Sequence, residues 1–225
     1  MAGRSGYVTI IGDKLMVHDL EQKINQLHRT PSDMNEHFPT IIKYGSEEGV
    51  NHITEMGCRG VCSTWGWLAC APENGFISYD LYHPSHWKPE TNMGIDGGQE
   101  LQSVYDTADA YGLKFDFIQA DVLKIDIEPT DLLFIDTWHC YDQLVAELKR
   151  HSDKVKKYLC FHDTTTYAHR SEPSTSENSF EGGLTEGKGL WDAVTEFLND
   201  NSDKWELVER YENNNGFTII KRIGS

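Results

Sequence analysis

The sequence predicts an α/β protein whose sheet is mostly parallel and ends in an antiparallel hairpin. From about residue 51 onward, short apolar runs alternate with segments of helical period, which is the pattern of parallel βαβ units with right-handed crossovers. Near the end of the chain, strand-like runs at 205–211 and 216–222 are separated by only four residues. Asn215-Gly216 is a strong signal for a tight turn between them, so we expect a terminal hairpin.

The first 45 residues are interpreted as an N-terminal helical extension, and residues 46–225 as the main domain. Leu20, Ile24 and Leu27 lie at i, i+4 and i+7, which places them on one face of a helix that Pro31 ends. The rest of the chain contains no internal repeat and no low-complexity linker, so one domain is expected there.

The core elements follow in order along the chain. Five apolar runs predict strands before the hairpin, at 51–56, 76–81, 114–119, 131–136 and 157–162. Apolar residues at helical spacing predict three helices, which carry Leu101, Val104, Ala108 and Tyr111, then Tyr141, Leu144, Val145 and Leu148, and finally Leu190, Val194, Phe197 and Leu198.

Composition narrows the class of protein. The 225 residues are 38% hydrophobic and 25% charged, as is usual for a soluble globular protein. No apolar run approaches the roughly 20 residues that cross a bilayer, and Gly12, Asp13 and Lys14 interrupt any signal-peptide core. The five cysteines are odd in number and form no zinc-type pair. We therefore expect a cytoplasmic protein with reduced thiols and no membrane partner.

The formal net charge is −16, from 20 basic and 36 acidic residues. An acidic surface repels phosphate backbones and lacks the basic patch through which nucleic-acid binders release counterions. A nucleic-acid partner is therefore disfavoured.

Two polar segments are too long to be simple connections. Residues 82–98 and 164–187 are rich in Gly, Pro and Ser, and both follow predicted strands. Ligands of open α/β sheets bind at the carboxyl ends of the strands, so these segments are candidate lids. The alternative is that they are plain surface loops.

A glycine-containing turn follows the first core strand. Gly57 and Gly60 lie between Glu55 and Ser63, and they allow the backbone to turn sharply and to approach a ligand. Ser63 or Thr64 is a candidate cap for the next helix. The turn matches neither the G-x-G-x-x-G fingerprint nor a P-loop.

Acidic residues follow the next two strands. Asp80 ends the second strand, 25 positions after Glu55, where a carboxylate can accept hydrogen bonds from a ribose diol. Asp121 follows the third strand and is within reach of an adenine amino group on the same interpretation. Together with the glycine turn they predict a nucleoside site. The alternative is that each aspartate caps a helix or forms a turn.

The fourth and fifth strands deliver Asp136, His139 and Asp163 to the same edge of the sheet. Two carboxylates that meet there repel each other unless a proton or a cation lies between them, and oxygen ligands suit Mg²⁺ or Ca²⁺. His139 is then a candidate general base for a substrate hydroxyl. Helix capping by the two aspartates is the alternative.

These segments resemble the class I S-adenosylmethionine-dependent methyltransferases. The resemblance rests on Glu-x-Gly followed by Ser-Thr, on the strand-end aspartates, and on FIDTWHCYDQLVAELK and YLCFHDT. It extends over roughly residues 45–222. The sequence is most similar to the branch that contains macrolide and rhamnosyl O-methyltransferases and cephalosporin hydroxylase-like proteins, in which a Gly-Leu-Trp run opens a late helix, as at residues 189–191.

The resemblance implies a Rossmann-like seven-stranded sheet and a set of site residues. S-adenosyl-L-methionine would contact Glu55, Gly57, Gly60, Ser63, Asp80 and Asp121. Asp136 and Asp163 would hold a divalent metal such as Mg²⁺, and Asp136 and His139 would be catalytic, with His139 as the base. The sequence departs from the pattern twice. Val61 stands where the second glycine of E-x-G-x-x-x-G falls, and Thr164 follows Asp163 where metal-dependent relatives often carry Asp or Asn.

Three functions remain open at this stage. The first is O-methylation of a small-molecule acceptor, such as a sugar or another hydroxylated metabolite. The second is oxidation at a metal held by His139, His162 and Asp136, which match the 2-His-1-carboxylate set. The third is a non-catalytic interaction protein with aromatic residues in its loops. The predicted N-terminal helix leaves a homo-oligomer open.

Overall fold

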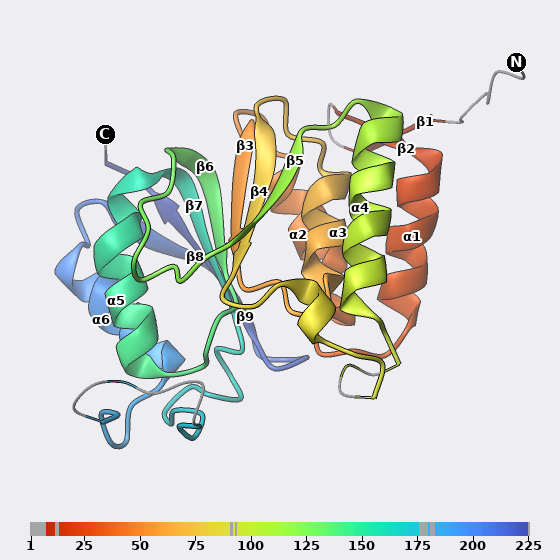
Figure 1. The fold of residues 1–225 in the computed structure, drawn as a ribbon. Helices are drawn as coiled ribbons and strands as arrows, with labels where there is room; N and C mark the ends of the chain where they lie inside the picture. Colours follow the sequence, from red (N-terminus) through yellow and green to blue (C-terminus); the bar gives the residue numbers. More distant parts are fainter. Residues whose placement is uncertain are drawn as a thin grey trace, which may run out of the picture.

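The computed structural model describes residues 8–11, 14–90, 92, 94–175, 180 and 183–224 (Figure 1). Its centre is a seven-stranded sheet in the order β5-β4-β3-β6-β7-β9-β8. The bounds of the strands are β3 His52–Met56, β4 Gly75–Asp80, β5 Phe115–Gln119, β6 Thr130–Ile135, β7 Val155–His162, β8 Trp205–Tyr211 and β9 Phe217–Arg222. β3 to β7 pair in parallel, whereas β9 is antiparallel to both β7 and β8. The prediction of a Rossmann-like, mostly parallel sheet with a terminal hairpin is confirmed.

Six helices flank this sheet in the described part of the chain, and they cover both faces (Figure 1). Their bounds are α1 His18–Arg29, α2 Phe38–Gly45, α3 Cys62–Ala69, α4 Gly97–Tyr111, α5 Tyr141–His151 and α6 Leu190–Asp200. α1 to α4 pack on one face and α5 and α6 on the other, so the sheet is buried between two helical layers. Strands that are covered on both faces are typically near-continuous apolar runs. β6 is covered in this way, and each of its residues is buried.

The N-terminal region contains one feature that the helical periodicity did not predict. Two four-residue strands, β1 (Val8–Ile11) and β2 (Lys14–Val17), pair antiparallel immediately before α1. α1 itself is confirmed, since Leu20 and Ile24 are buried and Leu27 packs against the same core as the sheet. The helix ends at Arg29, two residues before Pro31.

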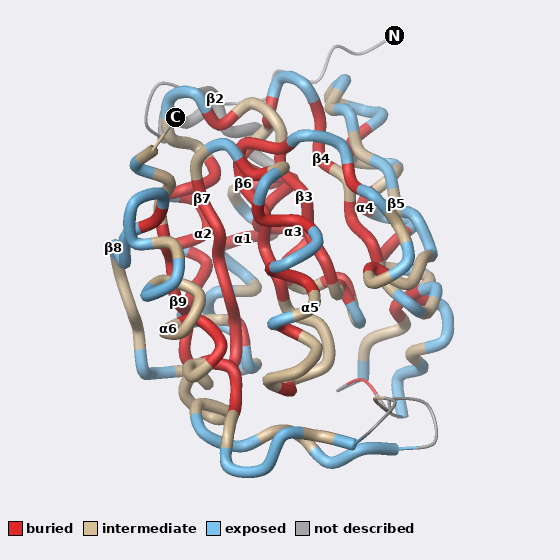
Figure 2. Tube along the Cα trace, turned by 90° about the vertical axis from the view of Figure 1, so that its left-hand side faces the viewer, coloured by how far each residue is buried: buried red, intermediate tan, exposed pale blue. Residues whose placement is uncertain are grey.

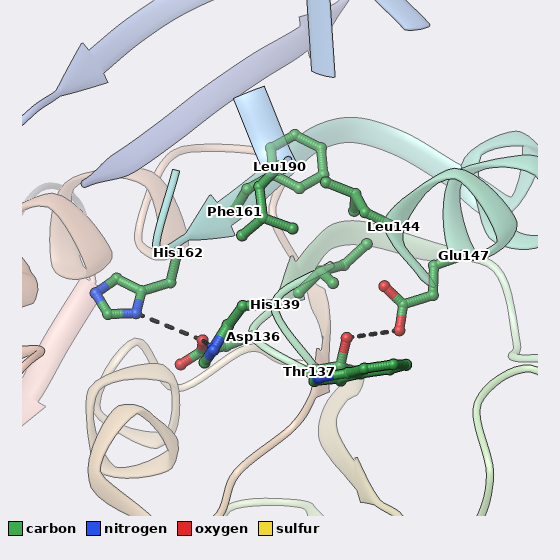
Figure 3. Close-up of a pocket in the computed structure, with 10 residues that line it drawn as sticks. Asp136, Thr137, His139, Leu144, Glu147, Phe161, His162 and Leu190 are labelled. Atoms are coloured by element: carbon green, nitrogen blue, oxygen red, sulfur yellow. Dashed lines mark hydrogen bonds and ion pairs between the residues drawn. The ribbon is translucent and has the colours of Figure 1, made fainter. Parts of the chain in front are cut away.

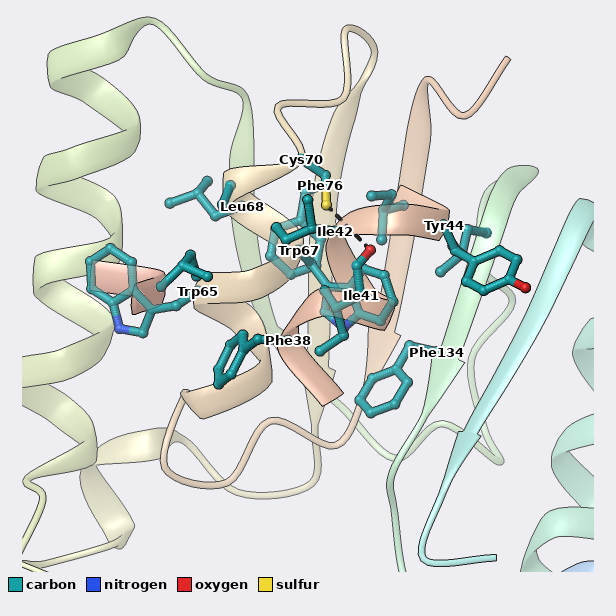
Figure 4. Close-up of a cluster of buried hydrophobic side chains, with 14 of the residues drawn as sticks. Phe38, Ile41, Ile42, Tyr44, Trp65, Trp67, Leu68, Cys70, Phe76 and Phe134 are labelled. Carbon is teal, nitrogen blue, oxygen red and sulfur yellow. Dashed lines mark hydrogen bonds between the residues drawn. The ribbon is translucent and has the colours of Figure 1, made fainter. Parts of the chain in front are cut away.

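The core on the α1–α4 side is rich in aromatic residues (Figure 4). Phe38 and Ile41 of α2 and Trp67 of α3 are almost completely buried, and Trp67 lies 5.3 Å from the ring of Phe134 on β6. Burying a side chain of this size contributes about 1.5–3 kcal/mol to stability. Close packing along β3 and β6 keeps their carboxyl ends in a fixed relation, and that is where the site residues lie.

The predicted helices match the observed ones except at one position. Val145, expected on the buried face of α5, is 37% exposed, whereas Glu147 is fully buried. All five cysteines are free, and Cys62 alone among them is not fully buried. None of the described helices is long and apolar enough to cross a membrane.

Both long polar segments leave the carboxyl ends of parallel strands, as expected. The loop after β4 contains the short 3₁₀ helix η2 (Pro84–His86), and the loop after β7 runs to α6. The two loops lie at the same end of the molecule, at the bottom of Figure 1, and the second is largely at the surface in Figure 2. Part of each lies outside the described residues.

Candidate active site at the carboxyl ends of β3 to β7

The glycine turn after β3 lies directly against the end of β6. Gly57 has a φ of +85°, and a Cβ atom there would lie 2.0 Å from the carbonyl oxygen of Asp136. The Gly57 N–H donates to the carbonyl of Tyr79, and the Asp136 N–H donates to the carbonyl of Met56, both at 2.8 Å. Only glycine allows this approach, so the turn and the strand end of Asp136 form one continuous surface.

Val61 adopts the backbone conformation that a glycine would have at this position of the turn. It precedes the first residue of α3 and has a φ of +69°, which is the left-handed conformation that glycine adopts without strain. A β-branched residue is rarely found there and costs of the order of 1–3 kcal/mol. The Val61 side chain is completely buried in the core, which compensates for this strain.

Glu55 and Ser63 are bonded to each other inside the protein. Glu55 is completely buried, and its carboxylate accepts hydrogen bonds from Ser63 (2.6 Å), Thr64 (2.8 Å) and Ser78 (2.6 Å). Burial raises the pKa of Glu55 to about 7, although the three hydroxyl donors oppose this shift. Neither Ser63 nor Thr64 caps α3, so the capping prediction was wrong. These hydrogen bonds connect β3, β4 and the start of α3, and they fix the two ends of the glycine turn.

Asp80 also stabilises the glycine turn, through hydrogen bonds from the backbone of the turn. Its Oδ2 accepts the backbone N–H groups of Cys58 and Arg59, each at 2.9 Å, and its Oδ1 accepts the N–H of Tyr82 at 2.9 Å. A carboxylate has about four acceptor positions, so Oδ1 keeps capacity for a further donor such as a ribose hydroxyl. The side chain is half-buried at the strand end.

Gly60 and Asp121 occupy the margins of this region. A Cβ atom on Gly60 would lie 2.4 Å from Nδ2 of Asn92, so the loop after β4 covers the turn. Asp121 accepts the N–H of Leu123 and pairs with Lys124 at 2.8 Å, which is the turn-forming role described above as its alternative.

Asp136, His139 and Asp163 converge as the sequence predicted, and Figure 3 shows Asp136 and His139. Nε2 of His139 lies 3.0 Å from Oδ2 of Asp163 and 3.4 Å from Oδ1 of Asp136. One ligand atom from each residue lies within 4.8 Å of the other two. Asp163 has a φ of +60°, and this left-handed residue turns the chain at the end of β7, where strained backbone is typical of functional sites.

His139 is oriented by two residues that sequence reasoning did not assign to it. Its Nδ1 donates to Glu172 at 3.1 Å, and its ring stacks on Tyr167 with centroids 4.9 Å apart. Burial alone would lower the pKa of His139, but the hydrogen bonds to Asp136, Asp163 and Glu172 raise it well above its ordinary value. Glu172 and Tyr167 both belong to the loop after β7, whose polar sequence carried no signal of this contact.

His162 joins the cluster from the last residue of β7. Its Nδ1 lies 3.1 Å from Oδ2 of Asp163 and 3.4 Å from Oδ1 of Asp136. Burial lowers the pKa of this imidazole, but the charges and hydrogen-bonding capacity of Asp136 and Asp163 together outweigh burial, and the net shift is upward. His162 also lowers the pKa of the Asp136 carboxyl, against the opposing effect of its burial.

Glu147 is a buried carboxylate beside the cluster, and no sequence motif pointed to it (Figure 3). It accepts hydrogen bonds from Thr137 and Gln143 at Oε1, both at 2.7 Å, and lines a cavity of about 10 Å³. Among the described residues, its Oε2 has no hydrogen-bond partner. Burial raises the pKa of Glu147 to about 7 against the effect of its two donors.

The stability of the protein should therefore depend on Glu147 and pH. Because the folded-state pKa lies above the ordinary 4.5, the native state favours the protonated form, and this stability is lost as pH rises toward and through 7. The loss approaches roughly 3 kcal/mol. We expect Glu147→Gln to match the wild type at pH 5 and to exceed it in unfolding free energy at pH 8, measured by urea denaturation. The exposed Glu206→Gln is the control, and equal pH slopes in all three proteins would contradict the assignment.

Comparison with solved structures places this geometry in a known fold. One similar structure is that of a proposed caffeoyl-CoA O-methyltransferase from Staphylococcus aureus, with 9% sequence identity, a TM-score of 0.56 and coverage of 91% of each chain. Another is an S-adenosylmethionine-dependent methyltransferase from Clostridium acetobutylicum, with 12% identity and a TM-score of 0.51, covering 92% of this chain and 98% of the other. The chain has the Rossmann-like methyltransferase fold.

A third similar structure contains a bound nucleoside. It is the SAH-bound methyltransferase of Podospora anserina, with 12% identity and a TM-score of 0.51, covering 97% of this chain and 91% of the other. No protein-family model matches the sequence, and no curated protein matches it significantly. At these identities the similarity concerns the fold, and the branch implied by the sequence resemblance stays a prediction.

Proposed function

We propose that this chain is an S-adenosylmethionine-dependent methyltransferase that methylates a hydroxyl of a small-molecule acceptor such as a sugar or another polyhydroxylated metabolite. The observation that carries the proposal is the contact between the glycine turn and the strand end of Asp136. A nucleoside bound at the turn would therefore lie beside the Asp136–His139–Asp163 cluster. The methyltransferase fold of the similar structures supports the same reading.

The chain's own residues would hold and orient the two substrates. Asp80 has a free acceptor position for a ribose hydroxyl, and the turn that contains Gly57 and Gly60 would lie against the amino-acid part of the cofactor. S-adenosylmethionine supplies an already electrophilic methyl group, so the protein contributes chiefly alignment and a base. The loops after β4 and β7 flank the site and would exclude water.

His139 is the proposed base. Glu172 accepts from Nδ1 and thereby leaves Nε2 as the atom that faces the acceptor. Nδ1 of His139 faces Glu172, and Nε2 faces Asp136 and Asp163, so these carboxylates favour the protonated ring. Nε2 can therefore accept a proton only when Asp136 and Asp163 interact with another positive group. A divalent cation would supply that interaction and would lower the pKa of a bound hydroxyl. The buried, hydrogen-bond-deficient Nδ1 of His162 beside both carboxylates fits such a cation.

Calorimetric titration with S-adenosylhomocysteine tests the cofactor site. We expect micromolar binding that weakens at least about tenfold in Asp80→Asn, because a neutral amide is a poorer acceptor for a ribose diol. Asp109→Asn removes the same charge from the exposed surface of α4 and should bind as the wild type does. Absence of binding by the wild type, with and without Mg²⁺, would contradict the proposal.

One observation favours a second candidate, oxidation at a redox metal. The structure brings His139, His162 and Asp136 together, which are the residue types of the 2-His-1-carboxylate set. Iron in the purified protein together with loss of S-adenosylhomocysteine binding would support this alternative over methyl transfer.

A further inference from the structure

His162 is a buried histidine at the site that takes no part in the proposed proton transfer (Figure 3). Its side chain is 1% exposed, and Nδ1 is within ion-pair distance of Asp136 and Asp163. Yet in the described part of the chain Nδ1 makes no hydrogen bond. Either a proton on Nδ1 or a cation between this nitrogen and the two carboxylates would supply the positive charge that the arrangement requires.

The other ring nitrogen of His162 is already committed. Nε2 lies 3.2 Å from the backbone carbonyl of Asn214, and because a carbonyl only accepts, Nε2 carries the proton. When a cation takes the place of the proton on Nδ1, the ring is neutral and directs the lone pair of Nδ1 toward the carboxylates. Metal-bound histidines commonly donate their second N–H to a carbonyl in this way, which fixes the tautomer and the ring orientation.

The distances among the three side chains match those of ligands around one ion. Nδ1 lies 3.1 and 3.4 Å from the two carboxylate oxygens, and the carboxylates themselves offer oxygens within 4.8 Å of each other. Donors about 2.1 Å from an ion lie roughly 3.0 Å apart in octahedral and 3.4 Å apart in tetrahedral geometry. A proton on Nδ1 can satisfy one oxygen at a time, whereas a cation is shared by all three donors.

We propose that His162 supplies a nitrogen ligand through Nδ1 and forms, with Asp136 and Asp163, a site that prefers a first-row transition ion such as Mn²⁺ to Mg²⁺. Imidazole nitrogen suits these ions, whereas Mg²⁺ and Ca²⁺ favour oxygen. The inference rests on the cation of the proposed function and adds its class and its third ligand. In this proposal His139, whose Nε2 lies 3.0 and 3.4 Å from the same two carboxylate oxygens, keeps the role of base.

The hairpin turn between β8 and β9 holds the supporting carbonyl in place. Asn214 has a φ of +47°, and its side chain bonds the carbonyl of Ser32 at 2.8 Å and the N–H of Glu36 at 3.0 Å. His37 also bonds the carbonyl of Asn214, at 3.0 Å, through its own Nε2. His37 is therefore a matched control, since it shares the carbonyl but is not paired with the carboxylates.

Pulsed electron paramagnetic resonance of the purified protein loaded with Mn²⁺ tests the ligand directly. We expect a ¹⁴N coupling in the wild type and in His37→Gln, and its loss in His162→Gln. Glutamine can keep a donor near the Asn214 carbonyl but has no atom equivalent to the Nδ1 lone pair. Calorimetry should show Mn²⁺ affinity reduced at least about tenfold in His162→Gln and changed less than about twofold in His37→Gln.

A second variant keeps the inference testable if His162→Gln does not fold. His162→Asn places an amide oxygen near the position of Nδ1, and we expect it to retain a cation site but to lower the ratio of Mn²⁺ to Mg²⁺ affinity at least about tenfold. A wild type without ¹⁴N coupling, or a coupling that survives in His162→Gln and disappears in His139→Gln, would overturn the inference.

The outcome is separable from that of the proposed function. Binding of S-adenosylhomocysteine by a protein that binds no Mn²⁺ would overturn the nitrogen site and leave methyl transfer standing. Nitrogen-coupled Mn²⁺ without S-adenosylhomocysteine binding would support the site and contradict the methyltransferase proposal.

Discussion

Replacing Gly57 with alanine is expected to lower the free energy of unfolding by about 2–5 kcal/mol and to abolish measurable binding of S-adenosylhomocysteine. The φ of +85° costs an alanine about 1–2 kcal/mol. The new methyl group would also meet the Asp136 carbonyl at 2.0 Å, and overpacking of this kind typically costs a further 1–3 kcal/mol or so. The end of β6 would have to move away from β3, and the glycine turn would separate from His139, the proposed base.

The matched control for this substitution is Gly112→Ala. Gly112 ends α4 at a φ of +67°, but a Cβ atom there has nothing within 4 Å. It therefore reports backbone strain without the clash and should cost only about 1 kcal/mol. Urea denaturation and calorimetry of both variants separate the two effects. Equal destabilisation would mean that the contact between the turn and β6 is not maintained in solution.

The sequence was sufficient to predict the sheet because burial on both faces leaves a simple signal. β6 is apolar at most positions and β7 at its carboxyl half, so each strand and the residue at its end could be placed in order. The parallel arrangement then brought Asp136 and Asp163 together, although they are 27 positions apart in the chain. The terminal hairpin followed from the turn at Asn215-Gly216 in the same way.

The missed residues are those whose role depends on long-range packing. Glu172 and Tyr167 reach His139 from a loop whose composition is typical of any surface segment. Glu147 lies on a helix where Val145 had the better apolar spacing, but Glu147 is hydrogen-bonded to Thr137 outside the helix and to Gln143 one turn earlier on it. Val61 shows that a glycine pattern is not required for the conformation, because burial of the valine side chain offsets the strain of its positive φ.

The second large effect is expected at His139. If Nε2 accepts the proton of the acceptor hydroxyl, His139→Gln should reduce turnover by about 10²- to 10⁴-fold, which is the usual contribution of a positioned base. Glutamine cannot accept a proton at neutral pH but can hydrogen-bond to Asp136 or Asp163. Affinity for S-adenosylhomocysteine should change less than about twofold, because His139 is not among the predicted cofactor contacts.

Transfer of a labelled methyl group to a panel of sugars and other polyols measures this loss, and calorimetry on the same preparations measures cofactor affinity. His169→Gln is the control, since His169 lies in the loop after β7 and pairs with Asp192, with a side chain that is 68% exposed. Turnover by His139→Gln equal to that of His169→Gln would remove His139 as the base.

Since Glu172 fixes the tautomer of His139, Glu172→Gln should cause a smaller loss of turnover, again without loss of cofactor affinity. That graded pattern follows from an imidazole that is held at Nδ1 and acts at Nε2, and a purely structural histidine would not produce it.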